Sequence, residues 1–334
     1  MESNALENIK SFVHTSQTVS LSSGWQAALE MGCAVAIWQL PYQKEKQLIV
    51  HFNGSVSTTK IVLEDAPTGF AFSPFLNEEG KDTLFIEADL YYRFGEKGEI
   101  LAEKAKEGLS LFQKEEWQKQ SQMVATASQT AANEALNRPS IPYQPASKER
   151  YMRSVEAAVA AIQAGHLKKV VLSRTKEIAL PTGLSPFMIF DRLCDKYPTA
   201  FVSMVYLPQL DQIWVGATPK RWFLWTRRVF LKPLLFVAGT QSAFDGNQQP
   251  IAPKQALWSQ KEIEEQALVG RYIISCFKKI RVREYLEEST KSAVANCLIH
   301  LLSEYKVDTK AIRFQKSAVV SNCCIRPLLF GKDT

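Results

Sequence analysis

The chain has 334 residues, of which 46% are hydrophobic and 22% are charged, so it is long enough to bury a large core and does not have the composition of a disordered protein. Its 15 glycines and 15 prolines exclude a collagen-like or low-complexity sequence. The 40 Lys and Arg residues outnumber the 34 Asp and Glu residues, for a formal net charge of +6. This excess raises the question of a nucleic acid or an anionic membrane as a partner.

The first ten residues are polar and acidic, so they do not predict a signal peptide. No run of about 18 apolar residues predicts a membrane span. The six cysteines form no C-x-x-C pair and the four histidines are scattered, which argues against a zinc site and against a disulfide framework. We therefore expect a cytoplasmic protein with reduced thiols.

The first third of the chain predicts strands separated by turns. Asn53-Gly54 and Glu79-Gly80 are typical turn sequences. The apolar segments that predict the strands are 33–40, 47–52, 60–63 and 83–88.

Two different segments follow these strands. Residues 99–122 are charged, with apolar residues at helical spacing, and predict a solvent-facing helix. Residues 126–147 contain three prolines and predict a linker or covering loop.

Ser147 is predicted to begin a helix that ends near Gly165, a residue suited to a helix C-terminus. Its apolar residues step by three and four: Met152, Val155, Val159 and Ile162. The later elements are predicted as a strand at 169–178, a short helix at 186–197, a hairpin of 200–206 with 212–217, and a long helix at 258–285. This mixture predicts an α+β fold with large antiparallel sheets and helices outside them.

Lys169 is the first candidate for chemistry, because it opens the apolar sequence Lys-Val-Val-Leu-Ser-Arg. A lysine drawn partly out of water can serve as a general base. By residue pattern alone, a solvated lysine at a strand end is the more frequent case.

Glu262 and Glu265 are the second candidate, three residues apart on the predicted long helix. Glu265 continues the apolar stripe of Val269, Tyr272 and Cys276, so it is expected to point inward. An inward carboxylate needs a partner, and carboxylate oxygens suit Mg²⁺. By residue pattern alone, a charged surface run is the more frequent case.

Two weaker candidates complete the set. The sequence 238–241, Ala-Gly-Thr-Gln, could offer backbone N–H groups and a hydroxyl to an anion, although most such tetrapeptides are turns. His300 lies in an apolar run, where a core histidine is more frequent than a catalytic one.

Together these features resemble the chorismate-utilising family, in which the same motifs occur in the same order. The motifs are Lys-Val-Val-Leu-Ser-Arg at 169–174, Gly-Ala-Thr-Pro at 216–219, Ala-Gly-Thr at 238–240, Lys-Glu-x-x-Glu-Gln at 261–266, and His-Leu at 300–301. The resemblance covers roughly residues 146–314, and the sequence Gly-Phe-Ala-Phe-Ser-Pro-Phe at 69–75 is similar to the family's N-terminal half. The family includes isochorismate synthase, salicylate synthase, anthranilate synthase component I and aminodeoxychorismate synthase.

The resemblance implies a Mg²⁺-dependent reaction on chorismate. In this resemblance Lys169 occupies the position of the base that activates water, and His300 occupies the position of the active-site histidine. The resemblance also places Glu265 at a metal ligand, with Glu262 beside it. Ala238, Gly239 and Thr240 fall on the turn that contacts the substrate.

Two positions distinguish members of the family. Lys169 replaces the glutamine of ammonia-using anthranilate synthases, and Ala238 replaces the nucleophilic lysine of aminodeoxychorismate synthases. Both residues imply water as the nucleophile and hence isochorismate synthase. Salicylate synthase stays open as an alternative, as does a non-catalytic chorismate-binding remnant. The choice between menaquinone and siderophore synthesis also stays open.

The sequence departs from the family in two places. Lys220 follows Gly216-Ala217-Thr218-Pro219, where the family has the Glu that acts as general acid. An ammonium group has the wrong charge and proton affinity for that role. We also expect the family's final part to be missing, because its His-Pro-Thr-Ser-Ala-Val motif and last metal-binding helix have no counterpart before Thr334.

A shifted reading frame would explain both departures. Codons can be chosen for 219–236 and for 323–333 that restore the missing Glu and the His-Pro-Thr-Ser-Ala-Val motif when they are read one nucleotide earlier. Local and family signals conflict in 220–236, so we expect the written chain to be poorly soluble and nearly inactive.

The positive charge agrees with this hypothesis. Residues 220–236 contribute +5 and residues 313–334 contribute +3, which leaves −2 for the rest of the chain. A nucleic-acid partner is therefore not expected, and neither is a membrane partner. We expect a monomer with one structural domain, made of an N-terminal part at 1–145, a chorismate-binding part at 146–314 and an aberrant tail at 315–334.

Overall fold

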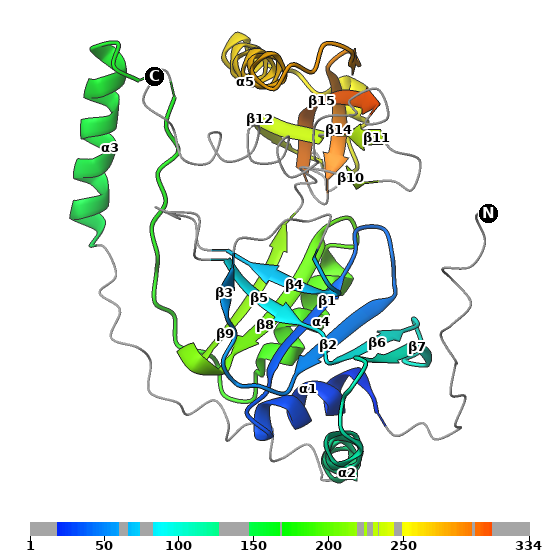
Figure 1. Cartoon of the computed structure of the whole chain (residues 1–334). Coiled ribbons are helices and arrows are strands. Elements are labelled where there is room, and N and C mark those ends of the chain that lie inside the picture. Colours follow the sequence, from blue (N-terminus) through cyan, green and yellow to red (C-terminus); the bar gives the residue numbers. More distant parts are fainter. Residues whose placement is uncertain are drawn as a thin grey trace, which may run out of the picture.

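The computed structural model describes residues 19–59, 66–73, 83–126, 147–167, 169–218, 224–225, 230–232, 234–243, 249–295 and 298–308. They form an α+β structure in which antiparallel sheets carry helices on their outer sides (Figure 1). The strand expected at 60–63, the turn at Glu79-Gly80 and nearly all of the linker expected at 126–147 lie outside the described residues.

The largest sheet has six strands in the order β7-β6-β2-β1-β8-β9, and every neighbouring pair is antiparallel. Its strands are β1 (Ala34–Gln39), β2 (Lys46–His51), β6 (Leu90–Phe94), β7 (Ile100–Ala105), β8 (Phe201–Leu207) and β9 (Gln212–Thr218). The strands expected at 33–40 and 47–52 and the hairpin expected at 200–206 and 212–217 are confirmed. Because β1 pairs with β8, strands far apart in the sequence share one sheet.

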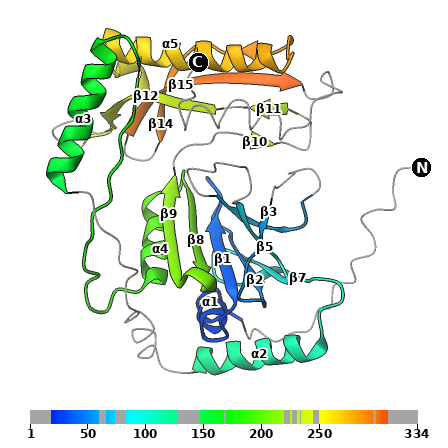
Figure 2. The ribbon, with the colours of Figure 1, turned by 60° about the vertical axis from the view of Figure 1, so that its left-hand side comes forward.

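Strand alternation gives this sheet two buried faces. Val35 and Ile37 point to a core shared with the helices, whereas Ala34 and Ala36 point to a second core. The first core lies under α1 (Leu21–Glu30), α2 (Leu111–Thr126) and α4 (Pro186–Lys196), and α1 and α2 line the outer side in Figure 2. The second core lies against the small sheet β3-β5-β4, formed by β3 (Thr58–Thr59), β4 (Gly69–Phe72) and β5 (Thr83–Glu87).

The helix expected at 99–122 is wrong in its first part. Residues 100–105 form β7, which pairs with β6 through a turn in which Gly98 has a φ of +83°. The charge pattern of this segment is typical of a helix, but the neighbouring strand offers its backbone a ladder of hydrogen bonds and overrides that preference. The helix α2 begins only at Leu111, and its Trp117 is buried, with Nε1 donating to Tyr92 Oη at 3.1 Å.

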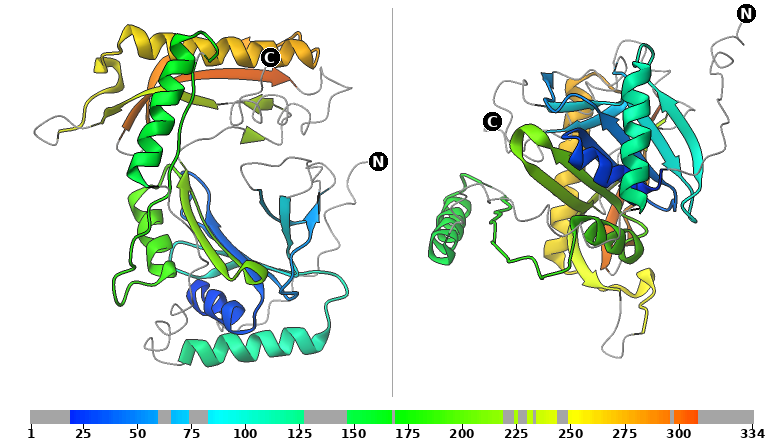
Figure 3. Two further views of the ribbon diagram at one scale, coloured as in Figure 1. Left: turned by 90° about the vertical axis from the view of Figure 1, so that its left-hand side faces the viewer. Right: turned by 90° about the horizontal axis from the view of Figure 1, so that it is seen from below.

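The helix expected after Ser147 is confirmed as α3 (Lys148–Gln163). The Ser147 side chain caps it by accepting from Arg150 N, and Gly165 follows its end with a φ of +78°. None of its residues is buried, and the apolar stripe that predicted it is 37–50% exposed. Figure 3 shows α3 standing apart from the sheets.

The strand expected at 169–178 is wrong. The segment has no regular secondary structure, and Val171 and Ile178 are 83% and 74% exposed. A strand requires a neighbour that pairs with its backbone, and no described strand pairs with this segment.

A second sheet is built around the long strand β15 (Leu298–Asp308). The strands that pair directly with β15 are β11 (Phe230–Lys232), β12 (Leu234–Ser242), β13 (Leu286–Glu287) and β14 (Lys291–Ala295), and β10 (Leu224–Trp225) pairs with β11. The helix α5 (Gln260–Lys279) packs on this sheet through Val269, Ile273 and Phe277 (Figure 2).

The helix expected at 258–285 is confirmed in its central part. It ends earlier than expected, because Arg281 takes a left-handed conformation with a φ of 58° and the chain then enters β13. No described helix has the length and apolar content needed to cross a membrane.

Candidate functional site

Lys169 and Glu265 form an ion pair across 96 residues of sequence. Lys169 Nζ lies 2.9 Å from Glu265 Oε2, and the two side chains are 28% and 29% exposed. Their partial burial strengthens the attraction relative to a pair in open water. Two residues that the sequence singled out separately are thus in direct contact.

The start of α5 determines where its two glutamates point. Ser259 and Glu262 form a capping box, in which Glu262 Oε2 accepts from Ser259 N at 2.7 Å and Ser259 Oγ accepts from Glu262 N at 3.3 Å. Glu265 lies nearly one turn further on and faces Lys169. The carboxylate of Glu262 is therefore engaged at the helix terminus, and its role beside a metal stays a prediction.

His300 and Thr240 lie directly opposite each other on β15 and β12. The tetrapeptide 238–241 was expected to form a turn, but it lies within β12, where residues 237–239 face the single residue Leu301. This irregularity is a β-bulge, which takes backbone groups out of the regular ladder. Bulges are frequent next to active sites, so the position suits the predicted substrate contact of Ala238, Gly239 and Thr240. Lys220 lies outside the described residues.

Sequence reasoning missed a buried polar contact between α5 and β15. Gln266 Nε2 on α5 donates to Ser303 Oγ on β15 at 2.9 Å, and both residues are 3% exposed. Gln266 follows Glu265 directly, and Ser303 is three residues from His300. Two sequence features could have indicated Gln266: it is the last residue of the motif at 261–266, and it lies on the inward face of the helix, one turn before Gly270.

The segment that carries Lys169 is held on its other side by α3. The guanidinium carbon of Arg174 lies 5.6 Å from the centre of the Tyr151 ring, which is a cation–π contact. This contact and the ion pair with Glu265 connect an otherwise exposed segment to two helices.

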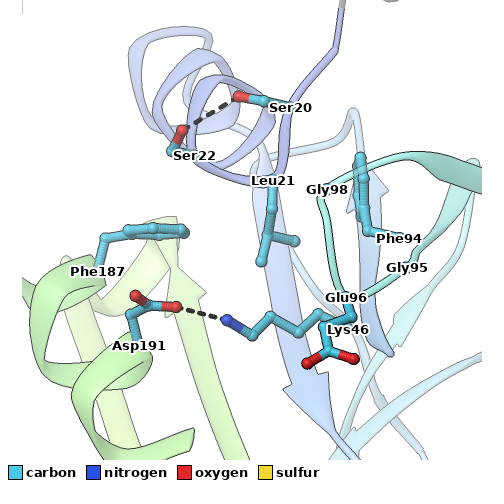
Figure 4. Close-up of a pocket in the computed structure, with 10 residues that line it drawn as sticks. All are labelled: Ser20, Leu21, Ser22, Lys46, Phe94, Gly95, Glu96, Gly98, Phe187 and Asp191. Carbon is cyan, nitrogen blue, oxygen red and sulfur yellow. Dashed lines mark hydrogen bonds and ion pairs between the residues drawn. The ribbon is translucent and has the colours of Figure 1, made fainter. Parts of the chain in front are cut away.

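A pocket of about 220 Å³ lies elsewhere, on the side of the six-stranded sheet that carries α1 and α4 (Figure 4). Lys46 reaches into it from β2 and forms an ion pair with Asp191 of α4. The lining residues are Ser20, Leu21, Ser22, Lys46, Phe94, Gly95, Glu96, Gly98, Phe187 and Asp191. None of the predicted site residues lines this pocket.

The described residues satisfy part of what a magnesium site requires. Within those ranges, no three His, Cys, Asp or Glu side chains gather closely enough to hold a metal ion. Magnesium, however, is commonly held by one or two carboxylates together with waters and substrate oxygens. Glu265 can provide one such carboxylate, so these residues fit an ion that shares its coordination with the substrate.

The fold is that of solved isochorismate synthases. MenF, the menaquinone-specific isochorismate synthase from Escherichia coli, aligns with a TM-score of 0.57 over 92% of this chain and 74% of its own, at 14% identity. The putative 2,3-dihydroxybenzoate-specific isochorismate synthase DhbC from Bacillus anthracis aligns with a TM-score of 0.53 over 90% of this chain and 75% of its own, also at 14% identity. The class of fold defined by this architecture is α+β with large antiparallel sheets.

The sequence itself carries the family assignment. The model of the family described as "Chorismate binding enzyme" matches residues 99–315, about two thirds of the chain. No curated protein matches the sequence. The chain belongs to the chorismate-binding enzyme family.

Proposed function

We propose that this protein is an isochorismate synthase by descent and that it binds chorismate between Lys169, Glu265 and the His300–Thr240 strand pair. The observation that carries the proposal is the 2.9 Å contact between Lys169 and Glu265, because it joins two family motifs that are 96 residues apart. The structural similarity to two isochorismate synthases supports the choice of reaction within the family. One of them is named for menaquinone and the other for 2,3-dihydroxybenzoate, so they favour neither pathway.

The reaction converts chorismate into its isomer, so one water adds to the ring and one hydroxyl leaves as water. Lys169 is the residue we assign to accept the proton of the attacking water. In the present arrangement Lys169 is engaged by Glu265, so the ion pair must open and Lys169 must give up a proton before it can accept one from the attacking water.

We also propose that Glu265 binds Mg²⁺ together with a substrate carboxylate. The ion would supply positive charge that offsets the repulsion between these two carboxylates. It would also compete with the ammonium group of Lys169 for Glu265.

We expect this activity to be weak in the present chain. The proton donor of the family is replaced by Lys220, and the segment that carries Lys169 is exposed rather than held in a sheet. A protein that binds chorismate without converting it is therefore the second candidate function.

Calorimetric titration of the full chain with chorismate, with and without Mg²⁺, tests the proposal. We expect binding that requires Mg²⁺ and that is at least tenfold weaker in Lys169→Ala and in Glu265→Gln. Lys176→Ala and Glu264→Gln are matched controls, because both residues are exposed neighbours of the same charge and should leave the affinity unchanged. If the full chain binds no chorismate, or if the controls weaken binding as much, the proposed site is wrong.

Product analysis separates the remaining alternatives. Isochorismate without pyruvate supports the proposed reaction, whereas pyruvate release would identify salicylate synthase chemistry. Binding without either product would identify the non-catalytic alternative, and turnover at an ordinary enzymatic rate would contradict the expected impairment.

A further inference from the structure

Buried polar side chains connect α5 to the second sheet beside the ion pair. Gln266 Nε2 donates to Ser303 Oγ at 2.9 Å, and Ser303 Oγ lies 2.8 Å from Thr290 Oγ1, with either hydroxyl able to donate. A buried amide must keep its hydrogen bonds, so these contacts permit few positions of the helix on the strand. Aliphatic side chains in the same place would tolerate sliding and rotation.

Gln266 is the residue of this chain of hydrogen bonds that directly adjoins the proposed site, because it is next to Glu265 on α5. Ser303 lies three residues from His300 on β15, roughly 10 Å along the strand, and this odd spacing places their side chains on opposite faces of the sheet. Thr290 directly precedes β14, in which Ala293 is opposite His300.

We propose that Gln266 is a positioning residue, which fixes the rotation of α5 on β15 and thereby directs the Glu265 carboxylate toward Lys169 and toward a substrate-bound magnesium ion. The part that concerns substrate and magnesium rests on the proposed function. The part that concerns the Lys169–Glu265 contact does not, because that contact is present without a ligand.

A measurement without ligand tests whether Gln266 positions Glu265 against Lys169. The coupling between Lys169 and Glu265 is obtained by comparing the unfolding equilibria of four proteins: the natural sequence, Lys169→Ala, Glu265→Gln and the double variant. We expect a coupling of roughly two- to fivefold in the unfolding equilibrium constant in the natural sequence. We expect no coupling when the same cycle is repeated with Gln266→Met, which has a similar length but no amide.

Cys276→Ala is the matched control, because Cys276 is also buried in α5 but lies about three turns from Glu265. It should lower stability and leave the coupling intact. If Gln266→Met does not fold, Ser303→Ala removes the same hydrogen bond from the strand side. Full coupling in the Gln266→Met or Ser303→Ala background, or no coupling in the natural sequence, would overturn the proposal.

Chorismate titration tests whether Gln266 also directs Glu265 toward the substrate and a magnesium ion. We expect Gln266→Met to weaken Mg²⁺-dependent binding by about tenfold or more, as outer-shell substitutions do at metal sites. Ser303→Thr retains the hydroxyl and should bind as the natural sequence does, whereas Ser303→Ala should not. If the natural sequence binds no chorismate, the proposed function fails, and the ligand-free coupling still decides whether Gln266 positions Glu265.

Discussion

Substituting Gly270 with alanine tests how closely α5 must approach β15 to place the site. A Cβ atom at this position would lie 2.8 Å from Tyr305 Oη, which is closer than packed atoms allow. Tyr305 cannot easily move away, because it is 1% exposed and its hydroxyl donates to Glu287 Oε1 at 3.1 Å. Its ring also packs edge-on against Phe277, with centroids 6.1 Å apart.

Two opposing contributions determine the size of the effect. Alanine is favoured over glycine inside a helix by about 1 kcal/mol. Overpacking in a filled core costs about 1–3 kcal/mol. We therefore expect Gly270→Ala to lower the free energy of unfolding by about 1 kcal/mol, although the helix preference alone would raise it.

Removing the Tyr305 hydroxyl separates the two contributions. Tyr305→Phe alone should cost about 1 kcal/mol for the lost hydrogen bond to Glu287. In that background the obstructing atom is gone, so Gly270→Ala should stabilise the protein by up to about 1 kcal/mol. Urea denaturation of the four proteins measures the coupling, which we expect to be about 1–3 kcal/mol. Additive effects would refute the steric reasoning, as would stabilisation by Gly270→Ala in the natural background.

Three further substitutions test other parts of the structure. The hydrogen bond from Lys306 lowers the pKa of Glu288 from its ordinary 4.5 to about 2. The pair therefore adds stability above pH 4.5, and this stability is lost as the pH falls toward 2. When unfolding is measured at decreasing pH, the Glu288→Gln variant should lose less stability than the natural sequence. Tyr92→Phe leaves the buried Trp117 Nε1 without its acceptor and should cost about 1–3 kcal/mol in urea denaturation, and a cost near zero would contradict this. Val159→Lys on the exposed face of α3 should change the free energy of unfolding by less than about 0.5 kcal/mol. It should also reduce aggregation measured by light scattering, because it removes an exposed apolar side chain. A large loss of stability would show that this face is covered in solution.

Several local features of this fold are specified by nearby residues. Ser147, Ser185 and Ser259 each begin a helix by accepting a backbone N–H three residues later, and such caps depend on a few consecutive residues. The hairpin of β8 and β9 follows equally from two apolar segments and the short connection between them. For this reason the sequence alone predicts these elements and the α+β class.

The same local reasoning failed where a distant neighbour decides the outcome. Residues 100–105 have the charge pattern of a helix but form a strand because β6 is available to pair with them. Residues 169–178 have the composition of a strand but form none, because no described strand pairs with them. Hydrogen-bonding partners across a sheet are not encoded in the segment that uses them.

The candidate site likewise combines features that the local sequence indicates with contacts that depend on tertiary packing. The sequence identified Lys169, Glu265, Thr240 and His300 individually, through the order of motifs that it shares with a family. It could not show that Lys169 contacts Glu265, because that contact depends on where the segment 169–178 lies against α5. Nor could it show that Thr240 faces His300, because that pairing depends on the register of β12 on β15. The buried Gln266–Ser303 hydrogen bond also arises only from the packing of α5 on β15. The sequence thus determined which residues are available for chemistry, and only the tertiary structure determined which of them meet.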